Sequence, residues 1–263
     1  MVLLLDFSIP GDIPGDGGRF STWLGYNGQT MFGVSFKGDQ VVPRQKRADE
    51  AGAIYHALNR GNRRQTIFHK DGDYEAFLRV LTQGLELHPV ELFAYVLMPN
   101  HWHMVLRPTE DGGMGRFLRW VTATHTLRYH AHYHTSGEGH VYQARFKSFP
   151  VENDGHFLVL CRYTERNPLR AGLVERAEDW QYGSLWEWLQ KSNERQLISP
   201  WPISRTANWI ERVNQALTEK ELAHVRTCVE RGRPFGRDAW VQKVAQRTGL
   251  DYTLRPIGRP PKL

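Results

Sequence analysis

Two histidines one residue apart have the types and spacing best suited to holding a metal ion. They are His101 and His103, in the segment PNHWHMVL at residues 99–106. In an extended strand alternate side chains share a face, so both imidazoles should project together while Trp102 points to the opposite face. Two imidazoles on one rigid strand form half of a divalent-metal site. The spacing alone equally fits two unrelated histidines at the rim of a sheet.

A tyrosine and an asparagine form a second candidate pair, in the segment CRYTERNP at residues 161–168. On a helix Tyr163 and Asn167 are four residues apart and share a face. A phenol has an ordinary pKa near 10, so as a nucleophile it needs a base or a cation that stabilises the phenolate. The amide oxygen of Asn167 could join the histidines as a third metal ligand. A packed tyrosine and a helix-end asparagine explain the pair equally well without chemistry.

The elements that must position these residues follow from the hydrophobic periodicity after residue 53. Alternating or continuous apolar runs predict strands, and a period near 3.6 predicts helices. The strands are expected over 53–59, 91–98, 101–107 and 141–151, with helices beginning near Asp73 and after Gly113, and a shorter helix beginning near Asp154. The order strand, helix, strand, strand, helix, strand predicts an α+β fold with a ferredoxin-like antiparallel sheet.

Composition divides the chain into four expected regions. Residues 1–42 are glycine-rich and aperiodic, and we expect a disordered N-terminal extension that is not certain to belong to the protein. Residues 43–175 form the predicted catalytic domain, 176–230 a helical extension, and 231–263 a basic tail. Within the tail, apolar residues at helical spacing over 239–245 predict a small helix.

The charge points to a nucleic acid. The 263 residues carry 34 Lys and Arg against 28 Asp and Glu, a formal net charge of +6. The excess is concentrated in residues 43–64 and 226–263, a pattern typical of nucleic-acid binding, although a solvated basic surface without a partner has the same signature. No apolar run approaches the ~20 residues of a membrane helix. Two cysteines exclude a disulfide scaffold. We therefore expect a cytoplasmic protein, associated with the nucleoid, with no membrane partner.

Several basic residues are candidates for contacts with DNA phosphates. Two alternate on the last predicted strand, so they would share a face, and two lie in the Arg-Gly-Arg-Pro motif of the tail. A rival metal site is also conceivable at His130 and His134, which share a helical face, but an exposed polar face explains them as well. The candidates for DNA contacts are Arg44, Lys46, Arg47, Arg63, Arg64, Arg145, Lys147, Arg231 and Arg233.

Three ordered motifs, AYVLMPNHWHMVL, HVYQARFKS and RYTERNPLRAGLV, resemble the single-tyrosine HUH transposases, the IS200-like transposases. The REP-associated tyrosine transposases are the branch they resemble most. The upstream segment IYHALNRGNRRQTIFHKDGDYEAFL is similar to the opening strand and helix of the same family. The resemblance covers roughly residues 43–185, and Trp102 departs from the small or aliphatic residue found between the two histidines in many members.

The resemblance implies a metal-dependent enzyme that cuts single-stranded DNA near a REP-like hairpin. It makes His101 and His103 the metal ligands, with Asn167 as the third, and Mg²⁺ or Mn²⁺ the ion, although two imidazoles also suit Zn²⁺. It makes Tyr163 the nucleophile that becomes linked to a 5′-phosphate. A non-catalytic DNA-binding protein or repressor with the same fold, and a metal-dependent hydrolytic nuclease, are the two alternatives. Monomer and homodimer are equally compatible with the sequence.

Overall fold

The structure is a computed structural model that describes residues 21–24, 30–33, 47–190 and 196–255. Contacts divide the chain into two compact units, residues 1–46 and residues 47–263. In the first unit, strands β1 (Ser21–Leu24) and β2 (Thr30–Gly33) pair antiparallel within the region expected to be a disordered extension. The four regions expected from composition stay a prediction.

The second unit is built on a four-stranded antiparallel sheet with the strand order β4-β5-β3-β6. The chain order β3-α1-β4-β5-α2-β6 and this strand order confirm the predicted ferredoxin-like α+β fold. The sheet places β5 and β3 side by side at its centre. The elements are β3 (Ile54–Arg60), α1 (Asp71–Leu87), β4 (Val90–Met98), β5 (His101–Pro108), α2 (Gly113–Tyr133) and β6 (Lys147–Val151).

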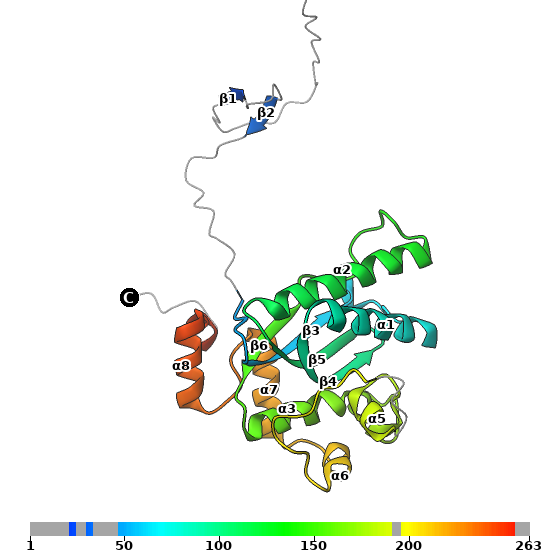
Figure 1. Ribbon diagram of the computed structural model, residues 1–263, viewed down its shortest axis with the longest axis vertical. Helices are drawn as coiled ribbons and strands as arrows, with labels where there is room; N and C mark the ends of the chain where they lie inside the picture. The colour runs from blue at the N-terminus through cyan, green and yellow to red at the C-terminus, as the bar shows by residue number, and fades with distance from the viewer. Residues whose placement is uncertain (1–20, 25–29, 34–46, 191–195, 256–263) are drawn as a thin grey trace, which may run out of the picture. The chain divides into compact units, whose positions relative to one another are not determined.

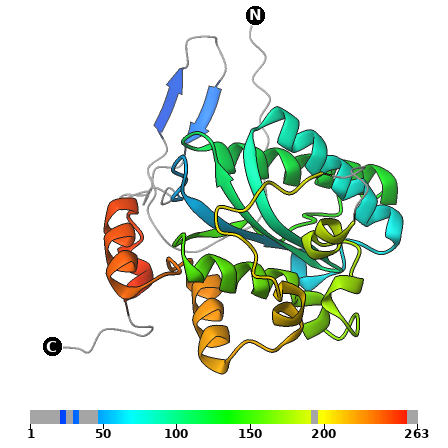
Figure 2. The same ribbon diagram turned by 60° about the horizontal axis from the view of Figure 1, so that its bottom comes forward.

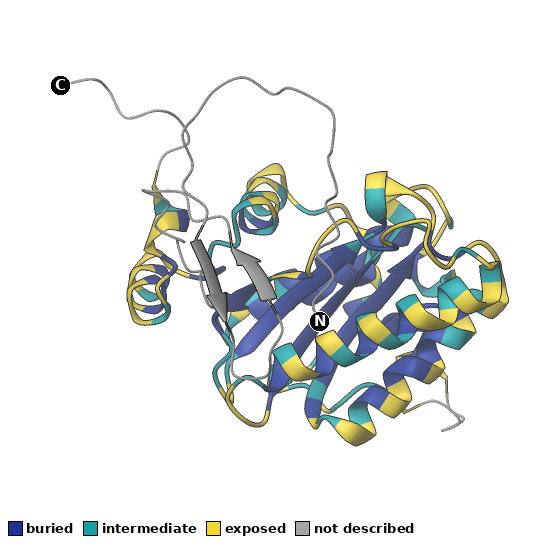
Figure 3. Cartoon of the chain, turned by 90° about the horizontal axis from the view of Figure 1, so that it is seen from above, coloured by how far each residue is buried: buried dark blue, intermediate teal, exposed yellow. Residues whose placement is uncertain are grey.

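Helices cover both faces of this sheet (Figures 1 and 2). Helices α1 and α2 pack on the face that carries Trp102 and Met104, and α3 (Gly155–Glu165) packs on the opposite face. The strands are buried along their length while the outer sides of the covering helices are exposed (Figure 3). Because α3 lies against the sheet face that carries His101 and His103, its side chains can meet the two histidines.

Further helices follow α3 and complete the second layer. The apolar sides of α6 and α7 join the cluster that α3 forms with the sheet. The predicted helix within the basic tail is confirmed as α8, and a bridge between Val151 and Phe235 holds the segment before it along the edge of β6. These elements are α4 (Asn167–Arg170), α5 (Ser184–Leu189), α6 (Trp209–Asn214), α7 (Glu219–Arg231) and α8 (Asp238–Thr248), with 3-10 turns η1 (Asn62–Arg64), η2 (Ala177–Asp179) and η3 (Asp251–Leu254). Within the described ranges no helix has the length and apolarity to cross a membrane.

The last strand of the sheet is shorter than the sequence predicts. It begins at Lys147, where the prediction placed a strand from residue 141. Leu58 pairs with Lys147, and Gly61 forms an isolated bridge with Tyr142. Leu58 and Gly61 are three residues apart, whereas their partners Lys147 and Tyr142 are five apart. Two extra residues of the second segment therefore leave the ladder between the two pairs. Arg145 lies in this interruption and does not share a strand face with Lys147.

The two-residue turn between β4 and β5 fixes the register of the histidine strand. Pro99 and Asn100 form the turn, and Met98 pairs with His101. A slip of one residue would bring His101 and His103 to the side of α1 and α2 and place Trp102 on the other. The burial of Trp102 against α1 and α2 therefore holds the histidines on the α3 side.

The lowered pKa values of two buried histidines, His56 and His125, predict that the protein loses stability in acid. Burial lowers the pKa of His56 to about 3 and that of His125 to about 4. Their unfolded-state pKa is about 6.5, so the stabilisation is complete above that pH and is lost as the pH falls towards 4. The free energy of unfolding should fall between pH 7.5 and pH 5 by on the order of 1–2 kcal/mol for each histidine.

Urea denaturation at pH 7.5 and pH 5 measures this difference, and the His125→Gln variant should lose the contribution of one histidine, on the order of 1–2 kcal/mol. A variant that keeps the full difference would show that His125 does not contribute.

Candidate active site

His101 and His103 lie together on one face of β5, as the strand alternation predicts. Their ring centroids are 5.0 Å apart. His103 is only 3% exposed, and His101 is half-buried. Trp102 is fully buried on the opposite face, where its indole Nε1 donates to the hydroxyl of Tyr142 at 3.3 Å. The bulky residue between the histidines thus anchors the strand and leaves the histidine face free.

Neighbouring side chains hold one nitrogen of each imidazole. Nδ1 of His101 lies 2.6 Å from Oδ1 of Asn100, and an amide oxygen can only accept, so His101 carries its proton on Nδ1. Nδ1 of His103 lies 2.9 Å from Nε2 of His56 in the buried interior. In both histidines Nε2 is left as the nitrogen that can bind a metal ion.

Burial keeps both histidines in the neutral form that binds metals. Desolvation, together with smaller contributions from the positive charges of Arg60 and Arg170, lowers the pKa of His101 to about 4. Desolvation likewise holds the pKa of His103 well below its ordinary value, with smaller contributions from His101 and His56. At neutral pH the lone pairs are therefore available without the loss of a proton.

Tyr163 faces the histidines from the last turn of α3. Its ring centroid lies 5.9 Å from that of His103, with the rings nearly perpendicular. The residue is 6% exposed. Asn167 sits beside it and donates from Nδ2 to the carbonyl oxygen of Tyr163 at 3.0 Å. The spacing of four residues thus places Asn167 beside Tyr163, although the predicted single helix is divided into α3 and α4 between them.

The end of α3 that carries Tyr163 is held by buried polar contacts. Glu165 is 2% exposed and accepts from the hydroxyl of Ser184 at 2.9 Å and from the indole of Trp209 at 2.7 Å. Arg162 donates to the carbonyl oxygens of Gln215 and Ala216. These bonds tie α3 to the helices of the second layer, so the position of Tyr163 relative to β5 is fixed by packing.

The oxygen of Asn167 is already engaged. Its Oδ1 accepts from Arg170 at 2.6 Å, and the Arg170 guanidinium carbon lies 5.5 Å from the Tyr163 ring centroid. The structure therefore brings His101, His103 and Tyr163 together, with Asn167 adjacent but bonded to an arginine. Its role as a third ligand stays a proposal.

Seven of the nine predicted DNA-contact residues are described, and all seven belong to the second unit. Arg44 and Lys46 fall outside the described residues. Arg63 and Arg64 are exposed in η1, directly after the β3 end that pairs with His101. Lys147 is exposed and lies in the same cross-strand row as Leu58 and His103. The guanidinium carbon of Arg47 lies 4.2 Å from the ring centroid of Phe146, and Arg145 is exposed. Arg231 donates to the carbonyl oxygen of Arg255, and the guanidinium of Arg233 lies 4.0 Å from the carboxylate of Asp238.

Three residues of the site were not predicted: His56, Arg60 and Arg170. His56 and Arg60 reach it through the pairing of β3 with β5, and that register is not readable from the sequence. Arg170 follows Asn167 by three residues, a helical spacing that could have signalled a contact.

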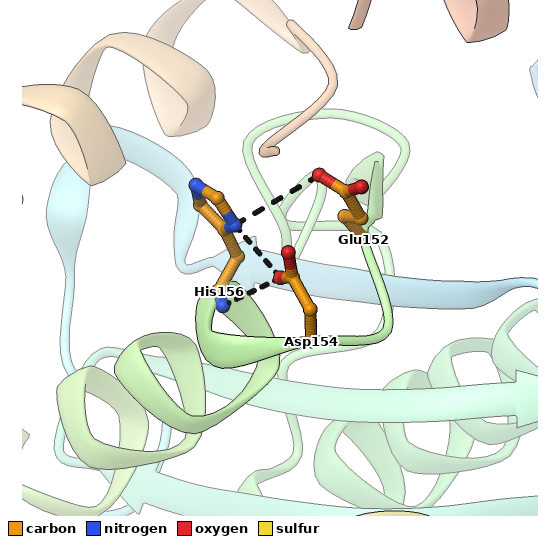
Figure 4. A group of neighbouring side chains, drawn as sticks. All are labelled: Glu152, Asp154 and His156. Carbon is orange, nitrogen blue, oxygen red and sulfur yellow. Dashed lines mark hydrogen bonds and ion pairs between the residues drawn. The ribbon is translucent and has the colours of Figure 1, made fainter. Parts of the chain in front are cut away.

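A second cluster of possible ligands lies at the start of α3. Atoms of Glu152, Asp154 and His156 lie within 4.8 Å of one another (Figure 4). Arg237 fills this cluster, because its backbone nitrogen and guanidinium bond Glu152 and its Nε lies 3.5 Å from Asp154. The guanidinium neutralises the carboxylates. The cluster is therefore interpreted as an ion-pair contact that holds the start of α3 to the segment before α8.

The rival histidine pair is not on one helical face. His130 lies in α2, but His134 follows the last helical residue and has a left-handed backbone. The Nδ1 of His130 is bonded to Thr135 at 2.8 Å. The pair expected as an alternative metal site is thus separated by the end of the helix.

The candidate site lies in an α+β domain with a ferredoxin-like antiparallel sheet. Residues 51–167 match the family model described as "Transposase IS200 like". The segment carrying His101, His103, Tyr163 and Asn167 therefore lies within the match to the IS200-like transposases, which confirms the resemblance of the motifs.

Several solved structures are similar to the chain. One is a REP-associated tyrosine transposase bound to a REP hairpin, 18% identical with a TM-score of 0.47, covering 62% of this chain and 94% of that one. Another is a candidate transposase from Deinococcus radiodurans, 16% identical with a TM-score of 0.34, covering 49% of this chain and 92% of that one. None of the curated proteins compared with the chain matches it.

Proposed function

We propose that the protein is a metal-dependent single-stranded DNA endonuclease and strand transferase. It cuts near a DNA hairpin and forms a 5′-phosphotyrosine intermediate at Tyr163. The observation that carries the proposal is the placement of Tyr163 against His103, 5.9 Å between ring centroids, within the IS200-like transposase domain. The hairpin is the substrate that the motif resemblance implies.

The candidate ligand atoms of the site are of kinds that bind a divalent cation. His101 and His103 offer Nε2 in neutral imidazoles, and Asn167 offers an amide oxygen once Arg170 releases it. Mg²⁺ or Mn²⁺ is the proposed ion, and the imidazoles favour Mn²⁺ of the two. When bound, the ion supplies positive charge that polarises a phosphate oxygen and stabilises a phenolate.

The covalent step exchanges one phosphate ester for another. The Oη atom of Tyr163 forms a bond to phosphorus, and the bond from phosphorus to the 3′ oxygen breaks. The phenol gives up its proton, and the departing 3′ oxygen takes one up and leaves as a hydroxyl. Because the ester bond is kept in the phosphotyrosine, a free 3′-hydroxyl reverses the step without a nucleotide cofactor.

The basic residues of the second unit supply a path for the DNA backbone. Lys147 lies two strands from His103 on the same sheet face, about 10 Å away by strand spacing. Arg63 and Arg64 extend the same end of the sheet beyond Arg60. These three are the proposed phosphate contacts nearest the site, and the other predicted basic residues described in this unit, Arg47, Arg145, Arg231 and Arg233, would hold the DNA farther away.

An adduct assay tests the proposal. Labelled hairpin oligonucleotides copied from DNA flanking the gene are mixed with the full-length protein and Mn²⁺, then run on a denaturing gel. A metal-dependent shifted band supports tyrosine chemistry. Cleavage without a shifted band would favour a hydrolytic nuclease, and binding of several hairpins without cleavage would favour a non-catalytic DNA-binding protein.

His56 should act as a positioning residue for His103. For Nε2 of His103 to bind a metal, its Nδ1 must carry the proton and donate to Nε2 of His56. Replacing His56 by Ala removes that acceptor, and the Mn²⁺ concentration for half-maximal adduct formation should rise roughly tenfold to a hundredfold.

Saturating Mn²⁺ should restore most of the adduct in His56→Ala, because no reacting group is lost. His56→Gln should keep a lower Mn²⁺ requirement, since its side-chain oxygen can accept the same proton. An unchanged requirement in His56→Ala would show that the contact does not position the ligand.

A further inference from the structure

We propose that Arg60 and Arg170 bind the phosphate that Tyr163 attacks, and that this contact makes divalent-metal binding depend on the DNA. The inference rests on the proposed function of the same site. It assigns the site an anion-binding half, formed by two guanidinium groups, beside the metal-binding half formed by the histidines.

Arg60 reaches the site from the neighbouring strand. It is the last residue of β3 and pairs directly with His101 of β5, so both side chains lie on the same face of the sheet. Its Nε is buried and has no hydrogen-bond partner. A buried donor without a partner is costly, and a phosphate oxygen is the kind of acceptor that would satisfy it.

Arg170 reaches the site from α4, in the layer of helices that covers this face of the sheet. It is exposed, donates to the side-chain oxygen of Asn167 at 2.6 Å, and lies over the Tyr163 ring. Within the described residues neither Arg60 nor Arg170 forms an ion pair with a carboxylate. Guanidinium groups bind phosphate through paired donors, so the two arginines present unneutralised charge of the right kind beside the nucleophile.

The positive charge of Arg60 and Arg170 weakens binding of the metal ion when no DNA is present. The ligand imidazoles are neutral, both arginines are positive, and the oxygen of Asn167 is bonded to Arg170. A divalent cation is therefore repelled and lacks an anionic ligand. A phosphodiester supplies negative charge and, by drawing Arg170 to itself, releases the oxygen of Asn167. Metal and phosphate then bind cooperatively, each raising the affinity for the other.

The test is a Mn²⁺ titration of the full-length protein, followed by the electron paramagnetic resonance signal of free Mn²⁺. It is run with and without dimethyl phosphate, a phosphodiester monoanion, at ionic strength matched with NaCl. Dimethyl phosphate should raise the Mn²⁺ affinity roughly threefold to tenfold. No change in affinity would overturn the coupling.

Variants give the coupling a signature that a structural role would not produce. In Arg60→Gln and Arg170→Gln, the affinity for Mn²⁺ alone should rise, because repulsion is removed, while the gain from dimethyl phosphate should disappear. The control is Arg79→Gln, an exposed arginine on α1 at the other face of the sheet, which should behave as the parent protein. Full coupling in the double variant Arg60→Gln/Arg170→Gln would overturn the proposal.

The same titration separates this inference from the proposed function. His101→Ala should lose Mn²⁺ binding with and without dimethyl phosphate, and Asp154→Asn, in the cluster filled by Arg237, should not. Mn²⁺ binding that survives His101→Ala would contradict the proposed metal site itself. Binding that is lost in His101→Ala, but shows no coupling in the parent protein, would overturn only the role of the arginines.

Discussion

Replacing Tyr163 by Phe should abolish the covalent protein–DNA adduct while hairpin binding stays within about twofold of the parent protein, because only the nucleophile is removed. The phenol hydroxyl forms no hydrogen bond within the described residues, so its removal breaks no internal contact. The ring remains packed at 6% exposure. Adduct formation should fall at least about a thousandfold, since no other nucleophile occupies this position.

Denaturing gels measure the adduct, and fluorescence anisotropy measures binding of the same hairpin. Tyr252→Phe is the matched control, because Tyr252 is 44% exposed in η3 and lies outside the proposed site. An adduct that forms in Tyr163→Phe at the parent rate would assign the nucleophile to another residue.

Replacing His101 by Ala should lower adduct formation on the order of a hundredfold or more, because one of two imidazole ligands is lost. His101 is half-buried at the start of β5, so truncation should leave the sheet intact. Unlike Tyr163→Phe, this variant keeps the nucleophile, and high Mn²⁺ should restore part of the activity.

The rate of adduct formation at several Mn²⁺ concentrations distinguishes the loss of a metal ligand in His101→Ala from the loss of the nucleophile in Tyr163→Phe. His130→Ala, which changes the rival histidine within α2, is the matched control and should show the parent Mn²⁺ dependence. Equal activity of His101→Ala and the parent protein at low Mn²⁺ would contradict a ligand role for His101.

The order of the elements could be predicted from the sequence because each strand and helix carries its own periodicity. The apolar run ending at Met98 and the turn at Pro99 and Asn100 define β4 and the start of β5 without tertiary information. The last strand was predicted too long, because apolar residues near Tyr142 resemble a strand while the pairing with β3 is interrupted there. The interruption depends on how two distant segments match in length, which a local pattern does not encode.

The candidate site was predictable where its residues are close in sequence. His101 and His103, and likewise Tyr163 and Asn167, are linked by strand and helix spacing. His56 and Arg60 depend on the register between β3 and β5, and register is a property of the folded sheet. The engagement of the Asn167 oxygen by Arg170 also required the structure, because spacing places side chains on a face without fixing their hydrogen bonds.

The most direct test of the account is to locate the covalent bond. The parent protein is allowed to react with a cleavable hairpin oligonucleotide and Mn²⁺, the DNA is trimmed with nuclease, and the protein is digested and analysed by mass spectrometry. The account predicts one modified peptide, containing Tyr163, that carries a nucleotide joined through its 5′-phosphate. Cleaved DNA with no modified peptide, or a nucleotide attached to a different residue, would contradict it.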